Sequence, residues 1–506
     1  MGIFGAPRHM PPPHPRQEPR YDIPLTAADI SRVFEGCADF SRRTAHLGGD
    51  PARPVELLYI AGQVRSERAC DYILRPLAQS RALRETPDFA AAFAAMAGGA
   101  LYSLNVQVRT TADQVLFDMV DGWVALFVPG QARALTLSAA TEEKRSVSDP
   151  ENEPDVKGAR DSFVESLRTN TSLVRRRLRT PELRVDEQLV GRQSVTPVDV
   201  VYIRGIADEA LAGRIRARLG EMDIDALLTT GSLEPYLTGQ LGTAFPLIAY
   251  TERPDRFCAG LTEGRVGVLA DGLPVGWLAP GTVDQFFRTG QDRSQNWMAA
   301  CALAVLRYLC VLVTLLLPGL YAAAVLFHPE LIPRRLAQSI IAARQSVPVP
   351  TLLEILLMLL SFEVLQEAGL RLPSSIGQTV SILGGLVVGT AAVDAKLVSP
   401  AVLVVVAVAG IAGYTAPSQD FAAALRLWRF GITAMAGVLG LVGLVLGCIL
   451  LIFHLARLES FGVAYLTPFA SNAGEQAQGH AVLRRPAPLT KLREKYLHTK
   501  NRRNQA

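Results

Sequence analysis

The sequence lacks the short motifs by which most enzymes hold phosphate, metal or an acyl group. It contains no G-x-x-x-x-G-K-[ST], G-x-S-x-G, H-E-x-x-H or C-x-x-C motif, and its seven histidines do not cluster. The six cysteines are scattered, with three in or beside apolar segments, which favours reduced structural thiols over a disulfide framework or a zinc site. We therefore expect no enzyme activity, no catalytic residue, no metal and no cofactor.

A secretion signal is also missing. The first 20 residues mix proline with basic residues and have no apolar core of signal-peptide length. We expect residues 1–50 to form a Pro-rich, basic extension, partly disordered, in front of the first folded unit.

Long apolar runs occur only in the second part of the chain. A mean hydropathy of +0.22 over 506 residues conceals this division. Leu309–Phe327 and Phe430–Phe453 approach or exceed the roughly 20 residues that cross a bilayer. The sequence thus predicts an integral membrane protein with a large soluble region up to about residue 296, followed by a transmembrane helical domain over 297–470.

The soluble region contains two pairs of similar segments, which indicates an internal repeat. Glu56-Leu-Leu-Tyr-Ile-Ala-Gly62 is similar to Asp199-Val-Val-Tyr-Ile-Arg-Gly205, and each pattern is typical of a buried strand that ends in a turn. Asp121-Gly122 and Asp271-Gly272 each lie between apolar runs, which predicts two equivalent hairpins. We expect two related α/β subdomains, 51–145 and 146–296, the second including a helical linker; the alternative is chance similarity of short strands.

Charged clusters lie in this linker and beyond it. Ser162–Glu165 predicts a capping box that opens a helix carrying Arg175, Arg176 and Arg177. The three arginines form either a solvated helix face or a docking face for a second subunit or anionic lipid. A denser cluster, with Glu252, Arg253 and Asp255, is either an active site or, as we favour, a charged turn. All six residues are candidates for a subunit interface.

The membrane half combines apolar segments with a few charges. Leu309–Phe327 is interrupted by Pro318-Gly319, so it should pack inside a bundle. Pro350–Ala368 carries Glu354 and Glu363, which face either an ion pathway or, in a re-entrant segment, water. Two apolar segments, Ile376–Val393 and Leu397–Ala416, follow.

Glycines four residues apart indicate close contacts between these helices. Such pairs occur at Gly385 and Gly389 and at Gly443 and Gly447. With Pro350–Ala368 as an optional fifth, we count four to five spans. An even number would put the soluble region and the C-terminal tail together, in the cytoplasm, and would leave Arg426 and Arg429 on the far side.

The tail, 471–506, is more basic than the whole chain. Its eight Lys and Arg against two Glu give a net charge of +6, compared with +4 for all 506 residues. Beside a membrane helix such a tail is expected at anionic lipid, and with one aromatic residue and no folded motif it does not indicate nucleic-acid binding.

Taken in order, the motifs between about Val55 and Phe469 resemble the GerA family, the A subunit of bacterial spore germinant receptors. The matching segments are Glu151-Asn-Glu-Pro154 with Lys157-Gly158, Asp161–Asn170, Arg175–Arg177, Tyr250–Asp255, Glu263–Arg265, Phe327–Glu330, Pro348–Pro350, Phe362-Glu363, Ile376–Gln378, Leu397–Pro400 and Phe461–Val463. The first subdomain matches loosely, and Ala464 stands where the family usually has Pro.

This resemblance implies a receptor subunit in the inner membrane of the spore. It would act with a transporter-like B subunit that senses nutrients and a lipoprotein C subunit, and would assemble as a homo-oligomer that forms a ligand-gated ion channel. Glu354, Glu363 and Gln378 are then the candidates for the pore or ion pathway. The alternatives are a secondary transporter or a scaffold that organises receptor clusters through Arg175–Arg177 and the tail.

Overall fold

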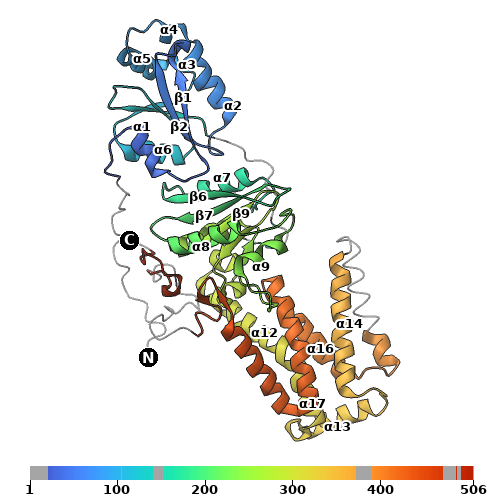
Figure 1. Ribbon diagram of the computed structural model, residues 1–506. Coiled ribbons are helices and arrows are strands. Elements are labelled where there is room, and N and C mark those ends of the chain that lie inside the picture. The colour runs from blue at the N-terminus through green and yellow to red at the C-terminus, as the bar shows by residue number, and fades with distance from the viewer. Residues whose placement is uncertain are drawn as a thin grey trace.

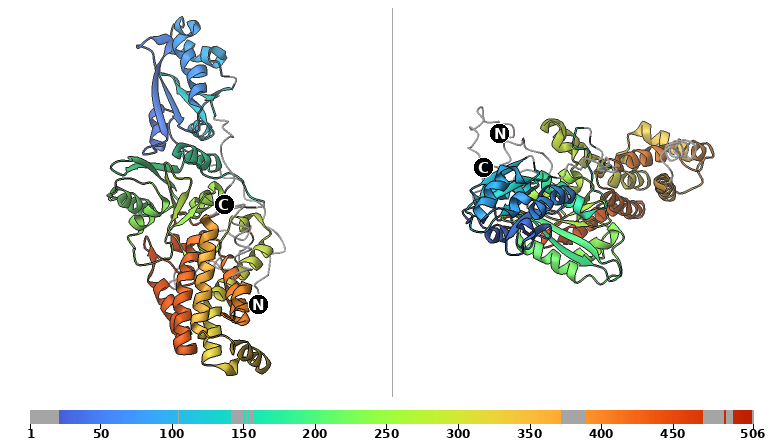
Figure 2. Two further views of the ribbon diagram at one scale, coloured as in Figure 1. Left: turned by 90° about the vertical axis from the view of Figure 1, so that its right-hand side faces the viewer. Right: turned by 90° about the horizontal axis from the view of Figure 1, so that it is seen from above.

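The structure, a computed structural model, describes residues 21–103, 105–140, 150, 153, 155, 157–371, 389–470, 486 and 492–504. Three parts follow one another along the long axis of the molecule: a first α/β subdomain, a second α/β subdomain and a set of long helices (Figure 1). The same succession is visible from the side in Figure 2.

The first subdomain is a five-stranded antiparallel sheet between two layers of helices. Its strand order is β1-β2-β4-β5-β3. The strands are β1 (Phe40–His46), β2 (Pro54–Ile60), β3 (Val106–Arg109), β4 (Trp123–Phe127) and β5 (Ala134–Ser138). The helices are α1 (Ala27–Val33), α2 (Ser66–Ala69), α3 (Arg75–Gln79), α4 (Arg81–Arg84), α5 (Phe89–Ala95) and α6 (Ala112–Val120).

Alternation along the strands supplies a core on each face of this sheet. Leu57 packs with the helices between β2 and β3, whereas Leu58 packs with α1 and α6. Since α1 and β1 belong to this unit, the subdomain begins earlier than the expected residue 51.

The second subdomain repeats this topology, with order β6-β7-β9-β10-β8. Its strands are β6 (Leu183–Val190), β7 (Thr196–Ile203), β8 (Ala249–Thr251), β9 (Val266–Ala270) and β10 (Gly276–Ala279). Its helices are α7 (Leu167–Arg177), α8 (Glu209–Gly220), α9 (Leu233–Thr238) and α10 (Pro254–Glu263).

The first sequence echo occupies equivalent places in the two sheets. The matching segments form β2 and β7, and the glycine after each, Gly62 and Gly205, has a positive φ, 83° and 79°. A left-handed turn therefore follows the second strand of each repeat.

The expected pair of equivalent hairpins was wrong. Asp271-Gly272 does join β9 to β10, but Asp121-Gly122 follows a helix, α6, and precedes β4. Val115, Leu116, Met119 and Val120 are all buried, at the spacing of one helix face, so the apolar run before Asp121 was helical rather than extended. The expected capping box was also wrong, because α7 starts after Ser166 and the Asn170 side chain binds the main chain of Val164 instead.

Helix α7 joins the two subdomains. Arg175 forms a two-pronged ion pair with Asp39 of the first subdomain, and both side chains are only 1% exposed. The amide of Gln63 donates to the carbonyl of Ser172 at 2.9 Å. Arg175 therefore lies neither on a solvated face nor on an external docking face, because its partner is in the same chain.

The helical part follows the second subdomain through η5 (Val283–Phe287) and α11 (Gln291–Ser294). Its long helices are α12 (Trp297–Leu326), α13 (Arg334–Arg344), α14 (Thr351–Arg371), α16 (Pro400–Gly413) and α17 (Gln419–Arg457), and a short hairpin, β11 (Glu459–Ser460) with β12 (Val463–Ala464), ends it. Pro318 does not interrupt α12, which runs through it. Gly319 lies against Thr433 and Ala436 of α17, and this close approach fits a helix packed inside a bundle.

Helix α17 reverses direction at Gly440, so the expected single span Phe430–Phe453 was wrong. Gly440 has φ 64° and ψ −144°, a backbone conformation open essentially to glycine alone. The rings of Trp428 and His454 are 5.4 Å apart, although a straight helix would separate them by about 39 Å. Gly443 and Gly447 lie in the returning arm, against Ile432 and Met435 of the first arm.

The expected four to five spans are not shown. Within the described residues, two helices, α12 and α17, are long and apolar enough to cross a membrane. The arms of α17, 419–439 and 441–457, would measure about 30 Å and 25 Å. Helix α16 has 14 residues.

The C-terminal tail also differs from expectation. Residues 492–504 lie on the second subdomain, where Tyr496 and Leu497 are buried. The expected contact with lipid could apply only to the rest of the tail, most of which lies outside the described residues.

We predict that Gly440→Ala destabilises the helical hairpin by about 1–3 kcal/mol, because alanine is strained at this φ and ψ. The melting temperature of the detergent-solubilised chain should fall. Gly431→Ala is the matched control. Gly431 lies in the first arm, and a Cβ added there would meet no atom within 4 Å, so alanine should leave the chain equally or more stable. Equal behaviour of the two variants would contradict the strain assigned to Gly440.

A second prediction concerns Asp199, whose fully buried side chain faces α7. Burial raises its pKa to about 6, although Arg168 and a hydrogen bond from Thr171 oppose this rise. Since the unfolded pKa is near 4, the folded state holds the proton more tightly and stability falls as pH rises from about 4 to 6. Above pH 6 the full cost is about 3 kcal/mol. Asp199→Asn should therefore melt higher than the parent at pH 7 and at the same temperature at pH 4; an equal difference at both pH values would refute this.

Candidate functional site

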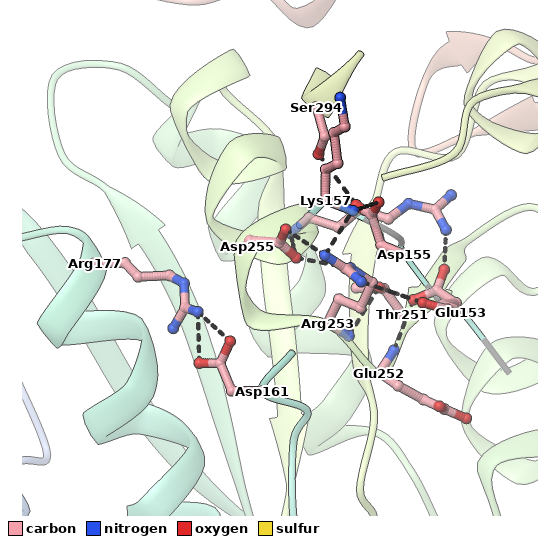
Figure 3. A network of polar contacts seen from close by, with 11 residues as sticks. Glu153, Asp155, Lys157, Asp161, Arg177, Thr251, Glu252, Arg253, Asp255 and Ser294 are labelled. Carbon is pink, nitrogen blue, oxygen red and sulfur yellow. Dashed lines mark hydrogen bonds and ion pairs between the residues drawn. The ribbon is translucent and has the colours of Figure 1, made fainter. Parts of the chain in front are cut away.

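A buried charged network occupies the junction between the second subdomain and the long helices (Figure 3). Arg253 is its centre, in the turn from β8 into α10, where Pro254 starts the helix. The main-chain N–H of Arg253 donates to the hydroxyl of Thr251 at 3.1 Å, which fixes this turn. The position of this turn at the end of β8 places the guanidinium of Arg253 beside the carboxylates of Asp155 and Asp255.

The guanidinium of Arg253 is 1% exposed and fully engaged. Its Nε and Nη2 donate to the carboxylate of Asp255 at 3.0 and 2.8 Å, and its Nη1 donates to the carbonyl of Glu153 at 3.2 Å. Asp155 lies 3.5 Å away and is equally buried. Although burial alone would raise the pKa of Asp255, the hydrogen bond and charge of Arg253 bring this pKa below its ordinary value.

The network extends towards helix α12. Ser294, in α11, donates to Asp155 at 3.1 Å. Two residues earlier in the chain, Asp292 forms ion pairs of 2.5 and 2.7 Å with Arg307 of α12. Helix α11 therefore links the network of Arg253 to the first long helix, with a polar contact to each.

Glu153 fixes the other side of the network. Its carboxylate pairs with Arg256 of α10 and accepts the hydroxyl of Thr251, and Arg256 also donates to the carbonyl of Gln285 in η5 at 3.3 Å. Since each guanidinium is paired with a carboxylate, the arrangement is suited to holding segments together rather than to transferring a proton or a group.

A cavity of about 430 Å³ separates this network from the helices. Its walls include Asp155, Arg253 and Arg256 on one side, and Gln366, Tyr414 and Arg426 from α14, the α16–α17 turn and α17 on the other. The expectation that Arg426 lies at the far end of the helices from the soluble region was wrong. The reversal of α17 at Gly440 brings both ends of this helix to the soluble side.

Glu363 is the acidic counterpart within the helices. From α14 it pairs with Arg426 at 3.2 Å and with Arg429 at 2.6 Å. These two arginines are three residues apart on α17 and share one face. Glu354 lies near the start of α14 and is fully buried. Its carboxylate accepts a hydrogen bond from the main-chain N–H of Ser399, just before α16.

The other sequence candidates are dispersed. Arg177 pairs with Asp161, Arg176 is half-buried beside it, and Arg253 is enclosed within the chain rather than on an outer face. Glu252 meets Glu153 through its main-chain N–H. Gly389 lies against Leu403. Gln378 and Gly385 are outside the described residues.

Several residues of the site were missed in the sequence. They are Glu153, Asp155, Arg256, Ser294, Arg426 and Arg429. Glu153 and Asp155 are about 100 positions before Arg253, and nothing local in the sequence indicates that pairing. The only usable signal was the presence of arginines in an otherwise apolar segment, which demands a partner.

Comparison with known proteins identifies the family. Residues 28–496 match the family described as Bacillus/Clostridium GerA spore germination protein. The chain belongs to this family.

Similar proteins cover most of this GerA-family chain. It is 36% identical to "Spore germination protein B1" of Bacillus subtilis over 88% of this chain and 91% of that protein. It is 32% identical to "Spore germination protein GerLA" of Bacillus cereus over 92% and 93%. It is also 36% identical to "Uncharacterized membrane protein YfkQ" of Bacillus subtilis over 87% and 84%.

A solved structure is also similar to part of the chain. It is the N-terminal domain of the A subunit of the Bacillus megaterium spore germinant receptor GerK3, at 30% identity and a TM-score of 0.40, covering 50% of this chain and 91% of that one. The family match and the curated relatives, rather than this structure, confirm the resemblance to the GerA family read from the motifs, and the chain is a spore germination protein of the A-subunit type.

We predict that Arg253→Met destabilises the chain by about 3–5 kcal/mol, because it leaves buried carboxylates without their cation. Thermal unfolding of the solubilised protein measures the change. Arg192→Met is the control, since the ion pair of Arg192 with Asp223 is exposed on both sides and contributes little. A loss no larger than the control's would contradict the central position of Arg253.

Proposed function

We propose that this GerA-family A subunit is a gated cation channel that starts spore germination. In this proposal it is an integral protein of the spore inner membrane and assembles as a homo-oligomer. It opens when a transporter-like B subunit binds a nutrient germinant, with a lipoprotein C subunit as third component. The soluble region and the C-terminal tail face the cytoplasm.

The observation that carries the proposal is the charged group at Glu363. A carboxylate and two guanidinium groups among apolar helices are costly to keep, and such groups usually belong to an ion pathway or a switch. In the conformation described, Arg426 and Arg429 neutralise Glu363. Movement of α14 away from α17 would free the carboxylate, and a ring of such carboxylates from several copies would favour cations.

The same movement has a route from the soluble region. Arg426 lines the cavity whose opposite wall contains Arg253 and Asp155, and Asp155 is joined through α11 to α12. A partner that displaces the second subdomain would act on the helices through these contacts. The germination names of the relatives support this setting.

The two alternatives have less support. A scaffold role through the arginine triplet conflicts with the burial of Arg175 against Asp39 inside the chain. A secondary transporter is usually built from repeated halves within the membrane, whereas the repeat here is formed by the two sheets of the soluble region.

We predict that Glu363→Gln slows cation release from germinating spores at least about tenfold, because the uncharged amide cannot favour cations in the pathway. Arg429→Gln should instead raise cation leakage without germinant, since Glu363 loses the partner at 2.6 Å. Spores carrying each variant at equal receptor levels would be followed by potassium release.

Glu221→Gln, at an exposed position just after α8, is the control and should leave release unchanged. Glu354→Gln tests the second pore candidate; it should reduce the amount of folded protein, because Glu354 binds the start of α16. Unchanged release in both glutamate variants would overturn the assignment of these residues to the pathway.

A further inference from the structure

The C-terminal segment 492–504 is folded onto the second subdomain. An antiparallel bridge between Leu492 and Arg503 closes it into a loop, supported by the N–H of Arg493, which donates to the carbonyl of Arg502 at 2.8 Å. Tyr496 and Leu497 are each 3% exposed and pack with Val463 of β12. The basic tail is expected at anionic lipid, so the burial of this part of it against the second subdomain requires an explanation.

Specific main-chain contacts hold this loop in place. The N–H groups of Asn501 and Lys500 donate to the carbonyls of Gly205 and Ile206 at 3.1 and 3.2 Å. The guanidinium of Arg493 donates to the carbonyl of Thr262 at 2.6 Å, and Lys500 pairs with Glu209 at 2.8 Å. These contacts lie at the turn after β7 and at the end of α10.

Two glycines with positive φ shape that surface. Gly205 turns the chain after β7, and Gly264, with φ 106°, ends α10. A methyl group on Gly264 would lie 2.2 Å from Cγ2 of Thr499, so the missing side chain leaves the room that Thr499 fills. The loop thus fits a specific hollow of this subdomain.

The first subdomain has glycines at the two equivalent positions. Gly62 follows β2 and Gly122 ends α6, both with positive φ, at the positions equivalent to Gly205 and Gly264. There α7 covers the turn at Gly62, where an added Cβ would lie 3.2 Å from the carbonyl oxygen of Arg168, whereas at Gly122 it would meet Gln63 and Ala140 of the first subdomain itself. Arg179, just after α7, forms an ion pair of 2.7 Å with Asp121. The glycine turn after the second strand is therefore covered by another segment of the chain in each repeat, by α7 at Gly62 and by the C-terminal loop at Gly205.

We propose that the two-glycine face of the second subdomain, formed by the turns at Gly205 and Gly264, is a peptide-docking site whose occupant is the chain's own segment 492–504. The docked loop fastens the chain beyond α17 to the soluble region. Through Leu497 and Val463 it also holds the β11–β12 hairpin at the end of α17. The second subdomain is thereby connected to the helices both where they begin, at η5, and after they end.

The first experiment measures whether the loop is docked. Hydrogen exchange in the full-length solubilised chain should show slow exchange at Lys500 and Asn501, whose amides donate to the subdomain. Leu497→Asp, which places a charge in the buried contact, should speed this exchange at least about tenfold. Arg502→Ala, at an exposed position, is the matched control and should not change it. Fast exchange of these amides in the parent chain would overturn the proposal.

The second experiment tests the face itself and does not depend on germination. A fluorescent peptide with the sequence of residues 488–506 should bind the Leu497→Asp chain, whose face is vacated, at least about tenfold more tightly than the parent, whose face is occupied. The same peptide with the Leu497→Asp change should bind neither. Equal binding of the unmodified peptide to both chains, or to neither, would overturn the proposal.

The third experiment distinguishes the chain's own loop from that of a second copy. In the double variant Glu209→Cys with Lys500→Cys, a short bismaleimide should join the two positions within one chain, seen as a monomer whose tryptic fragments are linked. The single variants are the controls for native cysteines such as the exposed Cys70. Links between two chains would show exchange of the loop and would refute docking within one chain.

Discussion

The burial of arginine side chains at the junctions of the chain is the constraint on which its assembly depends. A guanidinium removed from water must be paired and hydrogen-bonded, or the fold loses several kcal/mol. Arg175 meets this demand with Asp39 between the two subdomains, and Arg253 meets it with Asp155 and Asp255 beside the helices. Because the geometry of such pairs is narrow, each one fixes the orientation of the parts that it joins.

Each subdomain also has two glycines with positive φ at equivalent positions, next to surfaces that other segments contact. In each repeat one glycine with positive φ follows the second strand, and another follows the helix before the third strand of the sheet order. These are Gly62 and Gly122 in the first repeat and Gly205 and Gly264 in the second. Since glycine has no side chain at these points, a neighbouring segment can approach the main chain closely. The turn after the second strand contacts α7 in the first repeat and the C-terminal loop in the second.

The long helices pack mainly through apolar surface. Because polar partners are scarce there, the few charged side chains must pair with one another. The reversal of α17 at Gly440 turns a 39-residue apolar stretch into two arms that pack on each other and on α12. Arg426 and Arg429, in the first of these arms, lie beside Glu363 of α14, and the three charges pair with one another. In the proposed channel, separation of α14 from α17 would break these ion pairs.

Sequence reasoning succeeded where the signal was local or was carried by motifs in order. It located the strands β2 and β7 with their glycine turns, and the family. It misplaced elements where one pattern suits two structures: the apolar run before Asp121 is a helix, and α7 starts after Ser166 rather than at Ser162. It also took an arginine triplet for a surface, because periodicity along α7 cannot show what lies opposite Arg175.

The sequence by itself determined which segments are apolar, which turns need glycine, and to which family the chain belongs, because these depend on residues close together in the chain. The tertiary structure alone decided the pairing of Arg175 with Asp39, of Arg253 with Asp155, and of Glu363 with Arg429, and the docking of the basic C-terminal loop. These contacts join residues from about 66 to 300 positions apart. Their formation depends on the packing of whole subdomains, which brings opposite charges together and excludes water from them.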